Sequence, residues 1–275
     1  MTLYDRVEAA ILPWGGRVLA EGAADLLAFG VKEATACLFA AAFLALLALS
    51  RHVEVPGLAR YDLLFVGALA IQAALVASGR ESPRDVALLS LFHVIGLGLE
   101  LFKTSPAIHS WSYPEAASLR IGTVPLYSGF MYAAVASYTL QAWRLLRLRL
   151  EGFPPLPVAA ALAALVYANF FTSHFIGDLR WPLAAAVVVA FWRTRLHFTP
   201  RRREWCLPMP LAFLLVGLFI WIAENIATLF GAWVYPHQVH GWSPVGLAKV
   251  GSWTLLVIVS VVIVATAQMQ RKDAR

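Results

Sequence analysis

Two glutamates lie inside strongly apolar stretches of this chain, and the same short motif follows each of them. The first copy reads Glu100-Leu-Phe-Lys-Thr104 and then Trp111-Ser-Tyr-Pro114; the second reads Glu224-Asn-Ile-Ala-Thr228 and then Trp233-Val-Tyr-Pro236. A carboxyl group inside a hydrophobic helix is costly, and it is usually found where protons, ions or substrates are handled. The repeat therefore predicts one polar centre to which each half of the chain contributes an acid.

Polar residues extend from each acid along one helix face. In the first stretch, the steps of three and four residues spread the stripe over about 16 Å. Its members are His93, Gly96, Glu100 and Thr104. In the second stretch, the corresponding members are Trp221, Glu224, Asn225 and Thr228. An ionised acid at such a place needs a cation, a metal or several hydrogen-bond donors, and otherwise it stays protonated.

A second histidine precedes a third acid. His174 and Asp178 are one turn apart if the helix continues that far. The carboxylate would then either orient the imidazole for proton transfer or bind a metal together with it. The candidate catalytic residues, which are also the candidate metal ligands, are Glu100, Glu224, His93, His174 and Asp178.

Imidazole and carboxylate ligands suit iron, manganese or zinc. The chain contains no His-x-x-x-His, Glu-x-x-His or His-Glu-x-x-His element, so a structural or proton-handling network is favoured over a metal site. No metal is assigned, and the cofactor is unknown.

Aromatic residues of the two loops are read either as anchors at the membrane interface or as the rim of a pocket beside the acids. Lys249, in the last apolar stretch, is the natural partner for Glu224. The expected pocket residues are Thr104, Trp111, Tyr113, Asn169, Trp221, Asn225, Thr228, Trp233, Tyr235 and Lys249.

The elements that position these residues are membrane helices. Sixty per cent of the 275 residues are apolar, 14% are charged, and the mean hydropathy is +0.70. Apolar stretches of roughly 17 to 25 residues can cross a bilayer. We count eight, at approximately 28–50, 61–79, 84–102, 122–146, 155–177, 181–197, 207–231 and 243–268. The expected fold is an all-α, polytopic membrane helix bundle.

Basic residues predict its orientation. Thirteen lie in the connections after the second, fourth and sixth stretches and at the C-terminus, against five in the other connections. The positive-inside rule then places both termini of this multi-pass protein in the cytoplasm, at a bacterial inner membrane. The net charge of +6 follows from this asymmetry and from contact with anionic lipid head groups, without a nucleic-acid partner.

Eight crossings divide into two parallel units of four. Residues 28–150 would form the first unit and residues 151–275 the second, after an interfacial amphipathic segment at 1–27 that carries six charges. Other landmarks share nearly the same period, since Arg60-Tyr61 opens one stretch and Arg180-Trp181 opens its counterpart. A chance recurrence of interfacial Trp, Tyr and Pro is the alternative.

Longer motifs carry a resemblance. They are Phe92-His93, Glu100–Thr104, Ser110–Pro114, Val124–Tyr132, Tyr167–Phe171, Trp221–Ile226 and Gly231–Pro236. Together they resemble the YoaT-like family of bacterial integral membrane proteins, a family without an established activity. The duplicated unit, with its acids and Pro-bearing loops, is also similar in architecture to the small membrane carotenoid cyclases and hydratases, which protonate isoprenoid double bonds. The Pro-x-Glu-Glu element of those enzymes is missing here.

Three functions stay open. The favoured one is an intramembrane enzyme for a lipid or isoprenoid substrate, with Glu100 or Glu224 as proton donor and a histidine as relay. The second is a small-solute transporter coupled through the same acids, and the third is a structural or accessory subunit. The acids lie toward one face, whereas a carrier site is expected near the middle, so the enzyme is preferred. Membrane lipid is the expected partner, and the sequence names no protein partner.

Overall fold

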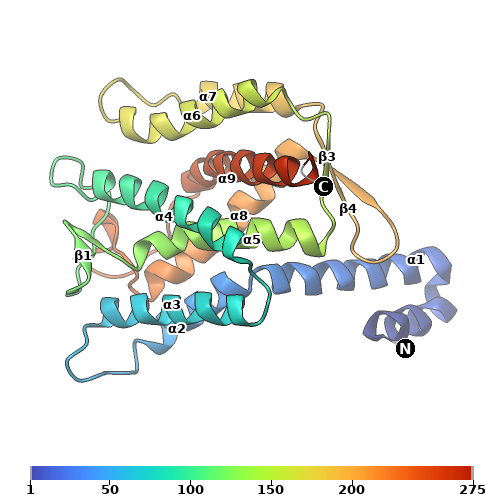
Figure 1. Ribbon diagram of the computed structural model, residues 1–275, viewed down its shortest axis with the longest axis horizontal. Helices are drawn as coiled ribbons and strands as arrows, with labels where there is room; N and C mark the ends of the chain where they lie inside the picture. Colours follow the sequence, from blue (N-terminus) through green and yellow to red (C-terminus); the bar gives the residue numbers. More distant parts are fainter. Residues whose placement is uncertain (1, 274–275) are drawn as a thin grey trace.

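The computed structural model describes residues 2–273, which form a mostly helical bundle with two small sheets (Figure 1). The helices are α1 (Leu3–Ala36), α2 (Leu38–Leu49), α3 (Arg60–Ala77), α4 (Pro83–Lys103), α5 (Ser128–Leu145), α6 (Leu156–Thr172), α7 (Arg180–Phe191), α8 (Met209–Leu229) and α9 (Ala248–Asp273), with a 3₁₀ turn, η1, at Pro236–Gln238. Arg275, one of the basic residues used to predict orientation, lies outside the described residues.

Helix α5 is the central helix of the bundle. It packs against α1, α2, α4 and α9, and most of its residues are buried. Small residues such as Gly129 and Ala133 let neighbouring helices approach closely, and the ring of His93 packs edge-on against Phe130. Because other helices surround α5, its polar residues Ser137, Thr139 and Gln141 are buried against protein and do not face lipid.

By length and composition, four helices of the described chain can cross a membrane. They are α3, α4, α8 and Ala248–Met269 of α9; the bent pair Gly16–Ala36 and Leu38–Leu49 makes a fifth. Helices α6 and α7 are apolar but shorter, with 17 and 12 residues. The sequence predicted eight spans, and in the structure four or five are long and apolar enough to cross a membrane.

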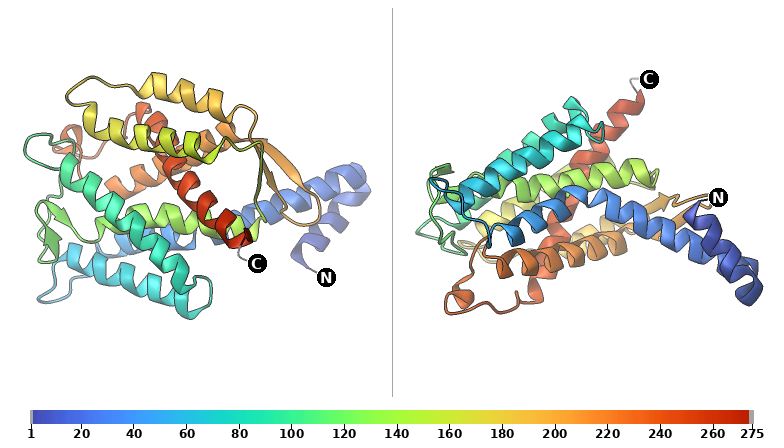
Figure 2. Two further views of the ribbon diagram at one scale, coloured as in Figure 1. Left: turned by 45° about the horizontal axis from the view of Figure 1, so that its top comes forward. Right: turned by 90° about the horizontal axis from the view of Figure 1, so that it is seen from below.

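The first predicted span, 28–50, is broken. Helices α1 and α2 meet at Cys37 with a bend of 61°. Upstream, Gly16 has a positive φ of 68°, and the residues before it fold back beside the rest of α1 (Figure 2). Asp5 and Glu8 form ion pairs with Arg201 at 2.8 and 2.5 Å. The N-terminal segment is therefore attached to the connection between α7 and α8.

That connection contains two strands, β4 (Arg195–Phe198) and β5 (Trp205–Pro208), which form one sheet with a third, β3 (Arg149–Glu151), from the connection between α5 and α6. The sequence analysis predicted none of the three. The sheet is antiparallel, in the order β3-β4-β5. Leu196 and Leu207 pair across it and pack on the helical core. The sheet ends α7 at Phe191, before the predicted end of the sixth span at 197.

Helices run between two ends of the bundle. Both ends of the described chain and the β3-β4-β5 sheet lie at one end, and the short hairpin of β1 (Arg120–Ile121) and β2 (Val124–Pro125) lies at the other (Figure 1). The hairpin occupies the start of the predicted span 122–146, so α5 begins only at Ser128. Helix α4 packs on α5 as α8 packs on α9, and α2 on α3 as α6 on α7.

Candidate functional site

Glu100 is held by three aromatic side chains near the end of α4. Its Oε2 accepts hydrogen bonds from Trp111 Nε1 at 2.8 Å and Tyr113 OH at 2.7 Å, and its Oε1 accepts one from Tyr132 OH at 2.7 Å. The Glu100 residue is only 3% exposed. Two donors come from the loop after α4 and one from the first turns of α5. Both carboxyl oxygens are therefore paired away from water.

Glu224 lies in the equivalent place on α8 and is also 3% exposed. Its Oε1 accepts from Tyr235 OH at 2.6 Å, and its Oε2 accepts from Trp253 Nε1 at 2.8 Å. As at Glu100, one partner belongs to the following loop and one to the next helix. We call the two sets the first cage (Glu100, Trp111, Tyr113, Tyr132) and the second cage (Glu224, Tyr235, Trp253).

The two cages meet at a backbone bridge. Ser112 and Val234, the central residues of the two Trp-x-Tyr-Pro motifs, exchange N–H···O hydrogen bonds of 2.9 Å in both directions, as antiparallel strands do. Next to this bridge, the rings of Trp111 and Tyr235 are 6.0 Å apart, edge to face. The loops that hold the two acids are thus joined directly, although 122 residues separate the bridged pair.

Lys249 occupies the junction between the cages. Its Nζ lies 4.6 Å from the ring centre of Tyr235 and 5.3 Å from that of Trp111, within the range of cation–π contact. No ion pair shorter than 4 Å joins Lys249 to either glutamate within the described residues. The lysine therefore contacts an aromatic ring of each cage, and each of these aromatic side chains in turn donates a hydrogen bond to a glutamate.

The hydroxyl group of each loop tyrosine donates a hydrogen bond to a carboxylate. Burial, followed by the charge of Glu100, raises the pKa of Tyr113 well above its usual value. Burial, followed by the charge of Glu224, does the same to the pKa of Tyr235. Each phenol therefore stays protonated at neutral pH and remains a donor.

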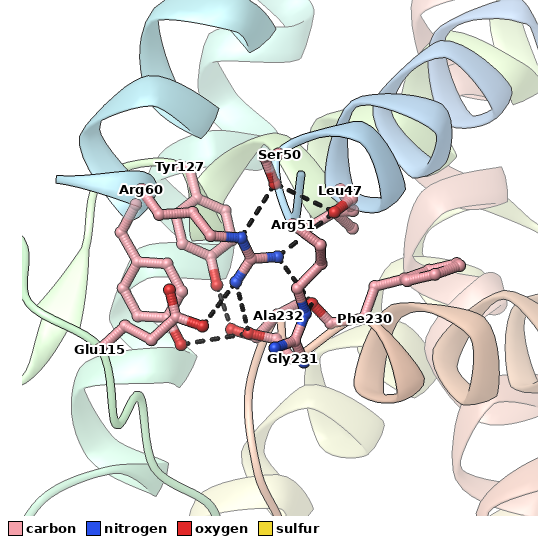
Figure 3. Close-up of polar contacts among 10 residues, drawn as sticks. Leu47, Ser50, Arg51, Arg60, Glu115, Tyr127, Phe230, Gly231 and Ala232 are labelled. Carbon is pink, nitrogen blue, oxygen red and sulfur yellow. Dashed lines mark hydrogen bonds and ion pairs between the residues drawn. The ribbon is translucent and has the colours of Figure 1, made fainter. Parts of the chain in front are cut away.

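The loop of the second cage starts at a helix end that several donors cap (Figure 3). Gly231, with φ of 68°, ends α8, and Ala232 N bonds back to Ala227 O at 2.9 Å. The Phe230 carbonyl accepts from Arg60 Nη2 at 2.6 Å and from Arg51 Nε at 3.0 Å. Cationic groups at the C-terminus of a helix are favourable because that end carries partial negative charge.

Arg60 also connects this helix end to other elements. Its guanidinium donates to Leu47 O and Ser50 Oγ at the end of α2 and pairs with Glu115 at 2.6 Å, while Tyr127 donates to Ala232 O (Figure 3). The loop that carries Trp233 and Tyr235 is therefore fixed by residues of the first half of the chain.

A cavity of about 1170 Å³ runs beside both cages. It extends from Leu196 and Phe198 of β4 to Trp111 and Trp233 of the motif loops, and its lining is mainly apolar. Its volume is at or above the roughly 300–1,000 Å³ of ordinary small-molecule sites. Acidic and basic side chains line it as well: Glu33, Glu100, Lys103, Asp178, Arg180, Glu224 and Lys249.

The other predicted pocket residues mainly serve the backbone. Thr104 donates to Glu100 O, and Thr228 donates to Asn225 O. Asn225 accepts from Val245 N at 2.9 Å, and Trp221 donates to Val245 O at 3.0 Å. The contacts of Asn225 and Trp221 hold Val245, just before α9, against α8.

Helix α6 ends at Thr172, so His174 and Asp178 do not face each other on one helix. Lys103 donates to His174 Nε2 at 2.7 Å, and burial, followed by the charge of Lys103, lowers the pKa of His174. Asp178 instead accepts from Asn169 Nδ2 at 3.2 Å and pairs with Arg180 at 3.0 Å. Burial raises the pKa of Asp178, but these hydrogen bonds outweigh it and leave the pKa below its usual range.

His93 lies away from the cavity. Its ring packs against Phe130 at 4.2 Å and lies close to Gly129. Within residues 2–273, no three His, Cys, Asp or Glu side chains come together as a metal site would require. The structure thus joins Glu100 and Glu224 through their loops but leaves His93 apart from them.

Sequence reasoning missed several residues of the site. Tyr132 and Trp253 hold the acids, Lys103 lines the cavity, and Glu33 accepts from Tyr138 OH at 3.0 Å in the same cavity. A signal existed for the first two, because they lie 121 residues apart, close to the period of the motifs.

Comparisons with known proteins place this chain in a family. Residues 25–261 match the model of a family described as protein of unknown function (DUF817). The chain belongs to this family. It is 47% identical to the uncharacterized protein YoaT of Bacillus subtilis (strain 168) over 250 residues, which cover 91% of this chain and 94% of that protein. No solved structure matches the chain. Membership of the YoaT-like family is thereby confirmed.

Proposed function

We propose that this protein is an intramembrane enzyme that acts on a lipid or isoprenoid chain by acid–base chemistry. One observation carries the proposal: two buried carboxyl groups, Glu100 and Glu224, line one end of a long and mainly apolar cavity. An apolar cavity of this length suits a hydrocarbon chain, and carboxyl groups at its end can transfer protons to it.

The donors suggest different roles for the two acids. Protonating a carboxylate weakens the hydrogen bonds that it accepts, and Glu224 accepts two whereas Glu100 accepts three. Glu224 is therefore the proposed proton donor. Its O–H bond would break as a carbon–hydrogen bond forms from the electron pair of a substrate double bond. Glu100 and the ring of Trp111 would then stabilise the positive charge left on carbon.

Removal of a neighbouring proton would complete the reaction. Glu100 would accept that proton, so the double bond would shift or a ring would close without any co-reactant. The proton that Glu100 then holds has to return to Glu224 before the next turnover. The Tyr235 hydroxyl, which can both donate and accept, would pass it on by accepting one proton as it donates another to Glu224. Trp253 N–H only donates, so it keeps Glu224 in place.

The membrane arrangement is part of the proposal. We take residues 1–27 as interfacial, and residues 28–150 and 151–275 as two parallel units of four crossings, with both termini cytoplasmic at a bacterial inner membrane. The helix pairs support this, because α2 contacts α8 of the other unit and α6 contacts α4 in the corresponding way. Crossing by the shorter α6 and α7 would require local bilayer thinning or cover by neighbouring helices.

The test is purification in a mild nonionic detergent, alongside Glu100→Gln, Glu224→Gln and the exposed control Glu54→Gln. Lipids extracted from each preparation are identified by mass spectrometry. Each lipid or isoprenoid that co-purifies is then incubated with fresh protein. We expect wild type and Glu54→Gln to hold a lipid or isoprenoid and convert it, and Glu224→Gln to hold it without conversion. Wild-type protein that binds no apolar chain, or conversion by well-folded Glu224→Gln, would refute the proposal.

A second candidate, proton-coupled transport of a small solute, has one observation in its favour. The cavity is lined by Glu33 as well as by Glu100 and Glu224, so acids lie at different depths along it. Proteoliposomes loaded at a different pH would distinguish the two functions. Solute uptake that depends on the pH gradient and fails in Glu33→Gln would favour a carrier.

A further inference from the structure

Three cations line the same end of the cavity. Lys103 ends α4, Arg180 begins α7, and Lys249 lies in the first turn of α9. Arg180 is near enough to each lysine, and the lysines to each other, to interact electrostatically, while Lys103 also interacts with Asp178 and Lys249 with Glu224 and Glu100. Like charges gathered beside apolar surface cost free energy unless negative charge offsets them.

Only part of this charge is offset by direct ion pairs. Asp178 pairs with Arg180 at 3.0 Å. Within residues 2–273, no carboxylate lies within 4 Å of Lys103 or Lys249. Lys103 instead donates to the imidazole of His174, and Lys249 lies over aromatic rings. Both amines therefore retain donors for an additional acceptor.

The glutamates do not take up these donors. Both oxygens of Glu100 and both oxygens of Glu224 accept hydrogen bonds from Tyr or Trp side chains. In the proposed reaction one of the two acids also carries the proton. The cations then outnumber the ionised carboxylates at this end of the cavity.

We infer that the ligand carries an anionic head group, a phosphate or a carboxylate, which Lys103, Arg180 and Lys249 bind while its apolar chain occupies the cavity. Ammonium and guanidinium groups form strong charge-assisted hydrogen bonds to both kinds of head group. The placement of the chain rests on the proposed function. The head group rests on the three cations and on the free donors of the two lysines, which line the cavity whatever reaction occurs there, and only the excess of cations over ionised carboxylates uses the proposed reaction.

The head group would also set how deep the apolar chain of the ligand lies in the cavity. Lys249 and Trp253 are four residues apart on α9, and so they share one face. Trp253 holds Glu224. An anion on Lys249 therefore places the first carbons of the chain beside the second cage, and more distant carbons deeper among the apolar residues.

The experiment compares ligands of one chain length by native mass spectrometry of the full chain in a polyoxyethylene detergent. The probes are hexadecyl phosphate, hexadecanoate and hexadecanol, together with inorganic phosphate alone. We expect one or both anionic amphiphiles to bind about tenfold or more tightly than the alcohol. The stronger of the two identifies the head group as phosphate or carboxylate.

Variants connect that preference to the cations. Lys103→Gln and Lys249→Gln should each remove most of the preference for the anion and leave binding of hexadecanol unchanged, and Lys103→Arg should retain it. Lys32→Gln is the matched control, because Lys32 donates to Thr199 O and lies outside the cavity lining. Circular dichroism and melting temperature establish that each variant folds.

The outcomes separate the two proposals. Equal binding of all three amphiphiles would overturn the head-group inference and leave the apolar-chain site intact. Binding of inorganic phosphate as tight as that of hexadecyl phosphate would also overturn it, since the chain would then contribute nothing. If no amphiphile binds to folded protein, the proposed function fails as well.

Discussion

The first and second cages are built alike at their carboxyl groups and differently around them. In each cage, a loop tyrosine and an aromatic side chain of the next helix donate to the acid. Only the first cage adds its loop tryptophan, Trp111, as a third donor. The shared contacts therefore hold both acids, and the additional donor Trp111 distinguishes Glu100 from Glu224.

Their cations differ in the same way. The first half supplies Lys103 three residues after Glu100, where the second half has Ala227 three residues after Glu224. The second half supplies Lys249, and at the offset of 121 that relates Tyr132 to Trp253 the first half has Ser128. Two similar frameworks can thus hold one site whose charged groups are unequal, which suits a reaction that needs one proton donor and one acceptor.

Removal of each carboxyl group tests this comparison with the largest expected effect. Glu100→Leu would leave three buried donors without an acceptor and Glu224→Leu two, and each unpaired donor costs about 1–3 kcal/mol. We expect both variants to melt at lower temperature than wild type in detergent, with the larger drop at Glu100. Glu54→Leu is the exposed control. An equal or larger drop for Glu224→Leu would show that the count of donors does not set stability here.

The capping cluster at the end of α8 holds the backbone of the second-cage loop and meets the first-cage loop through Glu115, outside residues 105–113. Arg60→Leu would remove charge-assisted hydrogen bonds worth about 1.5–3 kcal/mol each before allowance for partial exposure. We expect faster amide hydrogen exchange over residues 230–240 and little change over residues 105–113. Arg120→Leu, at an exposed arginine, is the control. Equal acceleration in both loops would mean that Arg60 stabilises the whole end of the bundle.

Removing one loop hydroxyl compares the cages by a single group. Tyr235→Phe leaves Glu224 one donor, and Tyr113→Phe leaves Glu100 two. Because hydrogen bonds to the ionised form favour ionisation, protonated carboxyl should increase more in Tyr235→Phe. Infrared spectra in the region of protonated carboxylic acids measure it. Since the pKa of both phenols is raised, the wild-type spectrum should not change from phenol ionisation below about pH 10.

An increase confined to Tyr113→Phe would reverse the roles of the two acids. A variant outside both cages, Tyr138→Phe, changes the hydroxyl bound to Glu33 and provides the spectral reference for a different acid of the cavity.

The smallest expected effect concerns Ser128. Its Oγ is buried without a hydrogen-bond partner, so Ser128→Ala removes an unsatisfied group and should be neutral or stabilising by about 1 kcal/mol. Ser137→Ala is the matched control and should destabilise, because Ser137 Oγ donates to Glu81 at 2.5 Å. Melting temperatures of the two variants measure the difference. A marked loss of stability in Ser128→Ala would mean that this hydroxyl has a partner in the membrane.

The sequence predicted the helical, apolar character of the chain, since composition and the length of apolar runs are local properties. It did not predict β3, β4 and β5, because strands of three or four residues carry little pattern of their own, and β3 forms only by pairing with β4 about 45 residues away. It also placed His174 and Asp178 on one helix face. Helix α6 ends before them, and their partners come from α4 and α7.

The sequence by itself determined that two acids lie in apolar helices and that a Trp-x-Tyr-Pro loop follows each. Tertiary structure alone decided which side chains hold them. Tyr132 reaches Glu100 from another helix, and Ser112 meets Val234 across 122 residues. A hydrogen bond is made or lost by differences of a few tenths of an ångström in the distance between donor and acceptor, and helix packing, not residue spacing in the sequence, sets that distance. The arrangement of cations around one shared cavity follows from the same packing.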